Sequence, residues 1–168
     1  MLVYITQTYE VTMQKISIPN YAELEIANVV LDYNGTLATN GIVSNDTRQT
    51  LAELTKLYDV YVITADTFGT VKQELEAFDL EVIVLSSIDH TAEKATLIER
   101  LGAEHTVAMG NGNNDRLMLQ KAQLSIALMG SEGCATATAM SSDIICKDIV
   151  DAMELLIHPK RLIATLRR

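Results

Sequence analysis

The chain has 168 residues, 48% of them hydrophobic, with only two prolines and no tryptophan. This length and composition predict one packed globular domain and exclude an intrinsically disordered chain. The formal net charge of −9 argues against a surface that binds nucleic acids or anionic membranes. Two cysteines are too few for a disulfide framework, and no apolar run reaches the ~20 residues that a membrane span needs.

The first 26 residues differ in pattern from the rest of the chain. They are expected to form two or three short strands with a turn at Ile18-Pro19-Asn20, because ITQTYEV and MQKISI mix β-branched and polar residues. The N-terminus has no basic lead and no long apolar core, so we expect no secretory signal peptide. These features together predict a cytoplasmic protein.

From residue 27 onward, predicted strands and helices alternate. Apolar runs typical of buried strands lie at 27–31, 60–63, 81–85, 106–109, 124–128 and, shorter, at 143–146. Amphipathic stretches that predict helices lie at 46–58, 70–78, 91–101, 115–123, 133–140 and 149–157. This order predicts an α/β fold with a doubly wound, Rossmann-like parallel sheet flanked by helices. We expect one domain, with a β extension at 1–26, the core at 27–157 and a C-terminal helix at 158–168.

Polar side chains follow several of the predicted strands at the point where each strand ends. Asp32 ends the first core strand, Thr64 ends the second, and GNGNND at 110–115 follows the fourth. In doubly wound sheets, ligands bind beyond the carboxyl ends of the strands, so these residues are expected to meet. Each of them alone is also typical of an ordinary turn, strand end or helix cap. Together they indicate a site for phosphoryl transfer.

The residue types in this group suit attack on phosphorus. Asp32 is a carboxylate nucleophile, ionised at neutral pH if its pKa is ordinary. Backbone N–H groups of the turn Asn34-Gly35-Thr36 are expected to hold phosphate oxygens, with Gly35 allowing close approach. Thr64 is expected to donate its hydroxyl to the phosphoryl group, and Lys94 to neutralise its charge.

The same group also offers oxygen ligands for a hard cation. Asp115, together with Asp32 and the backbone carbonyl of Asn34, is expected to bind Mg²⁺, which keeps several of its water ligands in proteins.

The motifs VVLDYNGTL, VITAD, the helix that carries Lys94, and GNGNND occur in the order and spacing of the four motifs of the haloacid dehalogenase superfamily. The chain resembles in particular the phosphorylation domain of P-type ATPases. There, a Thr-Gly-Asp motif stands where Thr64-Ala65-Asp66 stands here, and a Gly-Asp-Gly-x-Asn-Asp motif matches Gly110–Asp115. The segment SIALMGSEGCATATAMSSDII is similar as well, so the resemblance covers residues 27–157. Without membrane spans or a nucleotide-binding insertion, the chain looks like a small phosphatase-like relative of those pumps.

The resemblance implies a role for each matching residue. It makes Asp32 the nucleophile and assigns phosphate binding to Thr64, Ala65 and Lys94 together with the turn 34–36. It assigns the Mg²⁺ cofactor to Asp32, Asn34, Asn111 and Asp115.

Two positions depart from the family pattern. Phosphatases of the superfamily carry an aspartate two residues after the nucleophile, which serves as general acid and base. Here this catalytic position is Asn34, which can do neither. The first acid of the last motif, a direct Mg²⁺ ligand in the family, is Asn111, so the site has one negative charge fewer. Loss of a general acid and base lowers rates by roughly 10²–10⁴-fold, so we expect slow turnover.

Three functions remain open from the sequence. The first is a slow Mg²⁺-dependent phosphohydrolase acting on a phosphorylated small molecule or a phosphoprotein. The second is a phosphate- or phosphoprotein-binding regulatory module that has lost turnover, and the third is a structural partner of an ion-transport system. Only 31 residues separate Asp32 from Thr64, which leaves no room for an inserted cap domain. A site left open in this way suggests a homo-oligomer or a macromolecular substrate that covers it.

Overall fold

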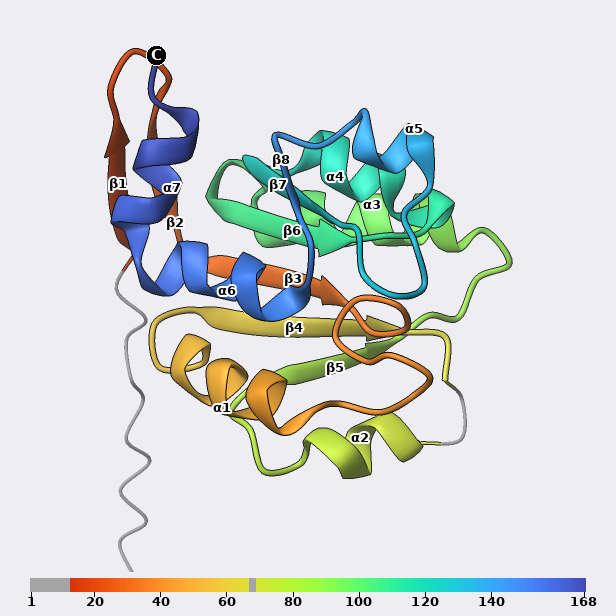
Figure 1. Ribbon diagram of the computed structural model, residues 1–168. Helices are drawn as coiled ribbons and strands as arrows, with labels where there is room; N and C mark the ends of the chain where they lie inside the picture. The colour runs from red at the N-terminus through yellow and green to blue at the C-terminus, as the bar shows by residue number, and fades with distance from the viewer. Residues whose placement is uncertain (1–12, 67–68) are drawn as a thin grey trace, which may run out of the picture.

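The computed structural model describes residues 13–66 and 69–168 and consists of a central parallel sheet flanked by helices (Figure 1). Six parallel strands lie in the order β5-β4-β3-β6-β7-β8, and a separate antiparallel hairpin is formed by β1 and β2. The strands are β1 (Gln14–Ile18), β2 (Ala22–Ile26), β3 (Asn28–Asp32), β4 (Asp59–Thr64), β5 (Glu81–Val84), β6 (Thr106–Gly110), β7 (Leu124–Leu128) and β8 (Ile144–Cys146). The predicted doubly wound α/β fold is confirmed.

The helices cover both faces of this sheet. They are α1 (Asn45–Leu54), α2 (Thr70–Leu75), α3 (His90–Leu101), α4 (Arg116–Lys121), α5 (Thr136–Ala139), α6 (Ile149–Ile157) and α7 (Pro159–Leu166), with short 3-10 turns η1 (Ala103–His105) and η2 (Asn113–Asp115). Helices α1 and α6 pack together on the face turned toward the viewer, and α3 and α4 pack together on the far face (Figure 1).

The core residues alternate between the two faces of the sheet. In β3, Val29 and Leu31 join the cluster on the α1 and α6 side, whereas Val30 joins the cluster on the α3 and α4 side. All five residues of β3, β6 and β7 are buried. This explains why these strands are continuous apolar runs in the sequence, since neither face meets water.

The chain order creates a switch point beside β3. From β3 the chain proceeds to β4 and β5 on one side, and then crosses over to β6, β7 and β8 on the other. Loops that leave β3 and β6 at their carboxyl ends therefore diverge, and a crevice between them is where doubly wound folds bind ligands. Asp32 and Gly110 end these two strands.

The N-terminal hairpin packs against the C-terminal helix. Ile16 and Ile18 of β1 and Leu24 and Ile26 of β2 are buried, and β1 contacts α7, whose Leu162 is buried as well. The predicted turn is present at 18–20, and the predicted strand at 5–11 lies outside the described residues. A short N-terminal hairpin is therefore part of the domain.

Some helices are shorter than the sequence predicted. The helix expected at 46–58 ends at Leu54, after which Lys56 and Leu57 donate to carbonyls three residues back. Such i to i−3 bonds are typical of a helix end. Leu51, Leu54 and Tyr58 are nevertheless buried on one side, so the predicted apolar face is correct although the helix is not continuous.

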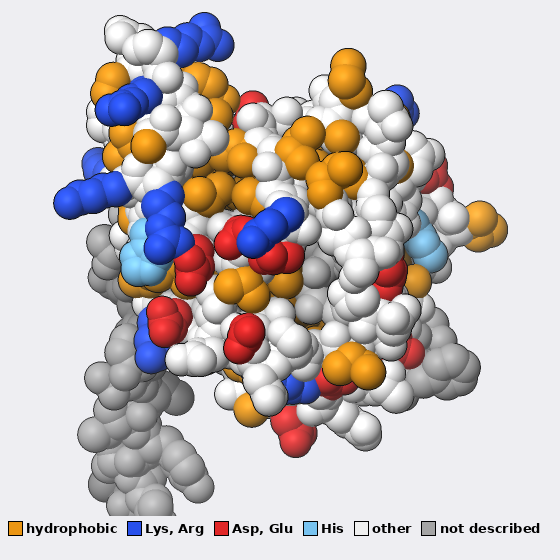
Figure 2. Space-filling view, in the orientation of Figure 1, with side chains coloured by type: hydrophobic (Ala, Val, Ile, Leu, Met, Phe, Trp, Pro, Cys, Tyr) orange, Lys and Arg blue, Asp and Glu red, His pale blue; other side chains and the backbone are white. Residues whose placement is uncertain are grey.

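None of the helices among the described residues is long and apolar enough to cross a membrane. On the face shown in Figure 2, most Lys and Arg side chains lie at the end of the molecule formed by α7 and the hairpin. Acidic side chains alternate with neutral ones over the rest of this face. No continuous basic surface appears on this face of the molecule.

Candidate active site

Asp32 lies at the carboxyl end of the central strand. β3 is bonded to β4 on one side and to β6 on the other, and the residue beside Asp32 in β4 is Ile63. The N–H of Tyr33 donates to the carbonyl of Ile63 at 3.0 Å, which extends the ladder by one residue. The Asp32 side chain is held by this rigid backbone and is almost completely buried.

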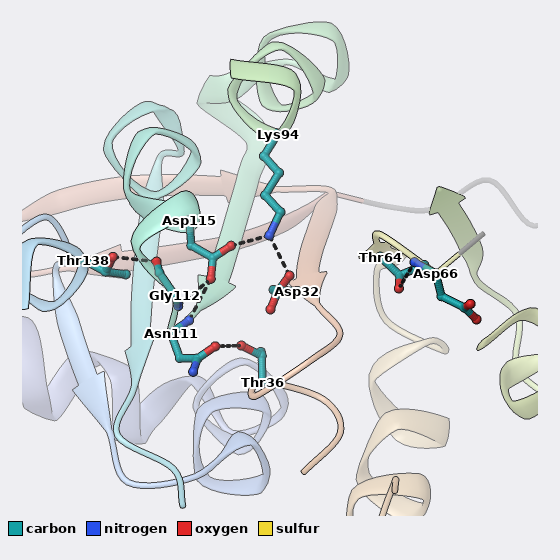
Figure 3. Close-up of polar contacts among 9 residues, drawn as sticks. All are labelled: Asp32, Thr36, Thr64, Asp66, Lys94, Asn111, Gly112, Asp115 and Thr138. Atoms are coloured by element: carbon teal, nitrogen blue, oxygen red, sulfur yellow. Dashed lines mark hydrogen bonds and ion pairs between the residues drawn. The ribbon is translucent and has the colours of Figure 1, made fainter. Parts of the chain in front are cut away.

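Lys94 reaches this carboxylate from the far face of the sheet. It is the fifth residue of α3, a helix that begins after Asp89, whose side chain accepts the N–H of Ala92. The ammonium of Lys94 donates to Oδ1 of Asp32 and to Oδ1 of Asp115, both at 2.6 Å (Figure 3). Lys94 is 2% exposed and Asp115 is completely buried. One cation and two acids are thus removed from water together.

The charges in this cluster are not balanced. Burial raises the pKa of the Asp32 carboxyl to about 7, and the charge of Asp115 adds to the rise, although the Lys94 ammonium opposes it. Burial alone lowers the pKa of Lys94, but the two carboxylates outweigh that effect and raise it. Lys94 therefore stays charged, and the site favours a proton or a further cation beside Asp32.

Asp115 is fixed by the loop that follows β6. Its Oδ2 accepts the backbone N–H groups of Asn111 and Gly112 at 2.9 and 2.8 Å. A Cβ on Gly110 would lie 2.5 Å from the carboxyl carbon of Asp115, so this position has no room for a side chain. Both oxygens of Asp115 already accept hydrogen bonds, and a metal would use the remaining lone pairs of Oδ1.

Asn111 links this loop to the turn after β3. Its Oδ1 accepts the hydroxyl of Thr36 at 3.3 Å, and its Nδ2 donates to the carbonyl of Gly133 at 3.0 Å. Gly35 has φ +79°, and a Cβ there would lie 2.6 Å from Nδ2 of Asn111. The close approach explains why glycine stands at this point of the turn.

The amides of the turn 34–36 are only partly available to a phosphate. The N–H of Gly35 donates to the carbonyl of Ala38 at 2.8 Å, and that of Thr36 to Tyr33 at 3.4 Å. The N–H of Asn34 has no such acceptor among the described residues, and the Asn34 side chain is exposed. Of the three amides expected to bind phosphate, Asn34 is thus the one that is free to do so without a change in the turn.

Thr64 follows Ile63, the residue paired with Asp32 in the sheet, and lies outside the hydrogen-bonded cluster of Asp32, Lys94 and Asp115. It is buried at the end of β4, and its hydroxyl accepts the N–H of Asp66 at 3.0 Å. Figure 3 shows Thr64 and Asp66 on the opposite side of Asp32 from Asp115. Asp66 accepts the N–H of Val71 at 3.1 Å and so supports the start of α2. Ala65 between them is exposed, which leaves its backbone at the surface of the site.

Two residues of this region were not found from the sequence. Thr138 is completely buried, and its hydroxyl donates to the carbonyl of Gly112 at 2.7 Å, which fixes the loop that holds Asp115. Glu132 accepts the N–H of Asn40 at 2.8 Å. Neither has a local signal, because Thr138 follows a run of small residues and Glu132 stands between glycine-containing turn residues.

The donors gathered here suit a hard cation. They are the carboxylates of Asp32 and Asp115 and the amide oxygen of Asn111, and oxygen is the ligand type that Mg²⁺ prefers. Within residues 13–66 and 69–168, no three side chains of the His, Cys, Asp or Glu type are grouped to hold a metal. A cation at this site would therefore depend on two acids, neutral oxygens and water.

A wide cleft adjoins the turn after β3. Its volume is about 580 Å³, and it lies between Gly35–Thr36, the end of β7 and the start of α6. Lys147 and Asp148 also line this cleft. The connection between β3 and β4 contains a loop and α1, and among the described residues it carries no further domain over the site.

Comparison with solved structures identifies the fold. A 3-deoxy-D-manno-octulosonate 8-phosphate phosphatase from Moraxella catarrhalis superposes with a TM-score of 0.65 at 19% identity, over 84% of this chain and 94% of that one. The corresponding cobalt-bound phosphatase (YrbI) from Haemophilus influenzae gives 0.65 at 15% identity, over 79% and 86% of the chains. A haloacid dehalogenase-like hydrolase from Bacteroides thetaiotaomicron gives 0.54 at 12%, over 79% and 100%. The chain has the haloacid dehalogenase-like fold, as its motifs predicted.

Sequence comparison identifies a relative at much higher identity than these structures. No family model matches the chain. The uncharacterized protein MJ0073 of Methanocaldococcus jannaschii is 46% identical over 78 residues, which are 44% of this chain and 84% of that protein. The chain belongs to the same family as this archaeal protein.

Proposed function

We propose that the protein is a Mg²⁺-dependent phosphohydrolase that acts through an aspartyl phosphate on Asp32. The observation that carries this proposal is the buried contact of Lys94 with Asp32 and Asp115 at the carboxyl ends of the central strands. The fold supports it as well, because the Moraxella neighbour is a phosphatase crystallised with a magnesium ion, a phosphate ion and a KDO molecule.

In the first step, a carboxylate oxygen of Asp32 forms a bond to phosphorus, and the ester bond breaks with its electron pair leaving on the alcohol oxygen. Lys94 offsets the charge that collects on the phosphoryl oxygens, and the amide of Asn34 and the hydroxyl of Thr64 orient them. In the second step, water attacks phosphorus and loses a proton to the solvent, and the bond from phosphorus to Asp32 breaks with its electron pair returning to the carboxylate; the alcohol oxygen released in the first step takes its proton from the solvent. Asn34 cannot give the leaving group a proton or take one from water, so both steps are slow.

Mg²⁺ would be held by Asp32, the carbonyl of Asn34, the amide oxygen of Asn111 and Asp115. It would neutralise charge on the phosphoryl group and on Asp32, which share one buried site with Lys94. The substrate would be a phosphorylated small molecule or a phosphoprotein, because nothing inserted after β3 closes over the site.

The competing proposal is a regulatory module that binds phosphate without turnover. The observation that favours it is the pair of neutral residues, Asn34 and Asn111, at positions where the resembling phosphatases have acids. A structural role beside an ion-transport system would use the fold alone.

A phosphatase screen with and without Mg²⁺, run beside Asp32→Asn, separates these functions. Hydrolysis that needs both Mg²⁺ and Asp32 supports the enzyme. Phosphate binding without hydrolysis in any condition supports the regulatory module and overturns the enzyme.

A further inference from the structure

Glu132 lies in the segment between β7 and α5 and contacts two parts of the candidate site. Its Oε1 accepts the N–H of Asn40, a residue 92 positions earlier in the chain, at 2.8 Å. Its Oε2 lies 2.9 Å from the point that a Cβ of Gly35 would occupy. The carboxylate therefore stands over the turn that follows the nucleophile, with its side chain exposed to water.

The amide of Asn111 borders the same point. Its Nδ2 and Oδ1 lie 2.6 and 2.9 Å from the Cβ position of Gly35, so the side chains of Glu132 and Asn111 both lie close to this one point. The segment that carries Glu132 is also bonded to Asn111, whose Nδ2 donates to Gly133 and whose carbonyl accepts the N–H of Ala135 at 2.9 Å. These bonds hold the backbone that follows Glu132 against Asn111.

Asn111 is the position at which the metal site lacks a charge. Of the side chains that would hold Mg²⁺, only Asp32 and Asp115 are acids, and both already neutralise Lys94. Carboxylates that lie behind the direct ligands of a metal tune its affinity, typically by about 10–100-fold. Glu132 is an acid on the segment that is bonded to Asn111.

We propose that Glu132 supplies to the Mg²⁺ site the negative charge that Asn111 lacks, acting from beside the Asn111 amide. This inference rests on the metal site of the proposed function, but it does not require turnover. A purely structural role would need only an acceptor for the N–H of Asn40. Glutamine keeps that acceptor and removes the charge, so Glu132→Gln separates the two roles.

The test is calorimetric titration of Mg²⁺ into the metal-free protein. We expect Glu132→Gln to weaken Mg²⁺ binding by about 10-fold, with an unchanged melting temperature for the metal-free form. Glu76→Gln, which removes an exposed charge after α2, is the matched control and should bind like wild type. Asn111→Asp should tighten binding, and in that background Glu132→Gln should have a smaller effect, because the missing charge is already restored.

The inference is overturned if Glu132→Gln binds Mg²⁺ as wild type does, or if Glu76→Gln weakens it equally. It is also overturned if the wild-type protein binds no Mg²⁺. Phosphatase assays on the same variants test the proposed function separately. If Glu132→Gln weakens Mg²⁺ binding but no variant shows turnover, the role of Glu132 stands and the enzyme is rejected. If the protein turns over phosphate esters but Glu132→Gln binds Mg²⁺ like wild type, the enzyme stands and the role of Glu132 is rejected.

Discussion

Lys94 and Asp32 are 62 residues apart in the chain, and their side chains meet at 2.6 Å in a buried position. A buried ion pair gains little stability on its own, because removing two charges from water costs several kcal/mol per ion. Asp115 is a second buried carboxylate beside this ion pair, and it lowers the contribution of the cluster to stability further, since two acids share one cation. Such an arrangement fits a site made for a further positive charge rather than one made for stability.

The raised pKa of Asp32 gives a pH dependence to the metal-free protein. In the unfolded chain this carboxyl loses its proton near its ordinary pKa, whereas in the folded protein it does so near pH 7. Between these values the folded state holds the extra proton, so stability falls as pH rises, by up to about 1.4 kcal/mol per pH unit. Urea unfolding of the metal-free protein from pH 5 to pH 8 should show this decline.

Asp32→Asn should remove that component of the pH dependence and stabilise the metal-free protein at pH 8. The exposed control Glu53→Gln should retain the wild-type slope. Parallel slopes in Asp32→Asn and wild type would contradict a raised pKa for Asp32.

Mg²⁺ affinity should depend on Asp115. Asp115→Ala removes one of the two acids, and we expect calorimetry to show binding weakened by at least about 10-fold. Asp115→Asn keeps an oxygen for the N–H groups of Asn111 and Gly112, so it separates loss of charge from loss of the loop structure. Equal Mg²⁺ affinity in Asp115→Ala and wild type would remove Asp115 from the metal site.

The identity of residue 34 should decide which phosphate esters react. Without a proton donor at Asn34, good leaving groups such as those of aryl and acyl phosphates should depart, and alkyl leaving groups such as sugars should not. Asn34→Asp should raise kcat/KM for an alkyl phosphate by roughly 10²-fold or more, and less for an aryl phosphate. The side chain at 34 is exposed, so this change should not disturb folding.

Steady-state kinetics of wild type, Asn34→Asp and Asp32→Asn with one aryl and one alkyl phosphate make the comparison. If Asn34→Asp gains nothing while Asp32→Asn abolishes a robust activity, another residue or a water molecule supplies the proton.

The open site should be covered by assembly. Water that reaches the site weakens its electrostatic interactions, and a second copy of the chain is the simplest cover for a site over which the described β3–β4 connection inserts no domain. Light scattering at micromolar concentration should therefore show a homo-oligomer. A monomer at that concentration would instead favour a macromolecular substrate that covers the site itself.

The sequence predicted the sheet well because its central strands are buried on both faces. The runs at 27–31, 106–109 and 124–128 match β3, β6 and β7 to within one residue at each end. Helix ends were less predictable, since an apolar face such as that of Leu51 and Tyr58 continues past the point where the backbone leaves the helix. The helix expected at 133–140 is only α5, because Ala135 has an extended backbone with ψ 130° and Gly133 has φ +80°, so neither can belong to the helix.

The contact of Lys94 with Asp32 and Asp115 was predictable from the order of the motifs. Asp32 and the loop that carries Asp115 lie at the carboxyl ends of the neighbouring strands β3 and β6, and Lys94 lies on α3, which covers the same sheet. Their chemical roles, and those of Thr64 and Asn34, stay predictions. The sequence did not reveal that the Gly35 N–H is used by Ala38, because a bond inside the turn depends on its backbone angles. The contact of Glu132 with Asn40 was also not predicted, because the two residues are 92 positions apart and no local pattern indicates that they meet.

The last residue of the chain is tied to the hairpin turn. The N–H of Arg168 donates to the carbonyl of Pro19, and the Asn20 side chain donates to the carbonyl of Arg168. This end of the molecule is opposite the carboxyl ends of β3 and β4 (Figure 1). A biosensor surface or an affinity tag attached through Arg168 would therefore leave the candidate site facing the solution, which makes this the preferred point of attachment for screening phosphorylated ligands.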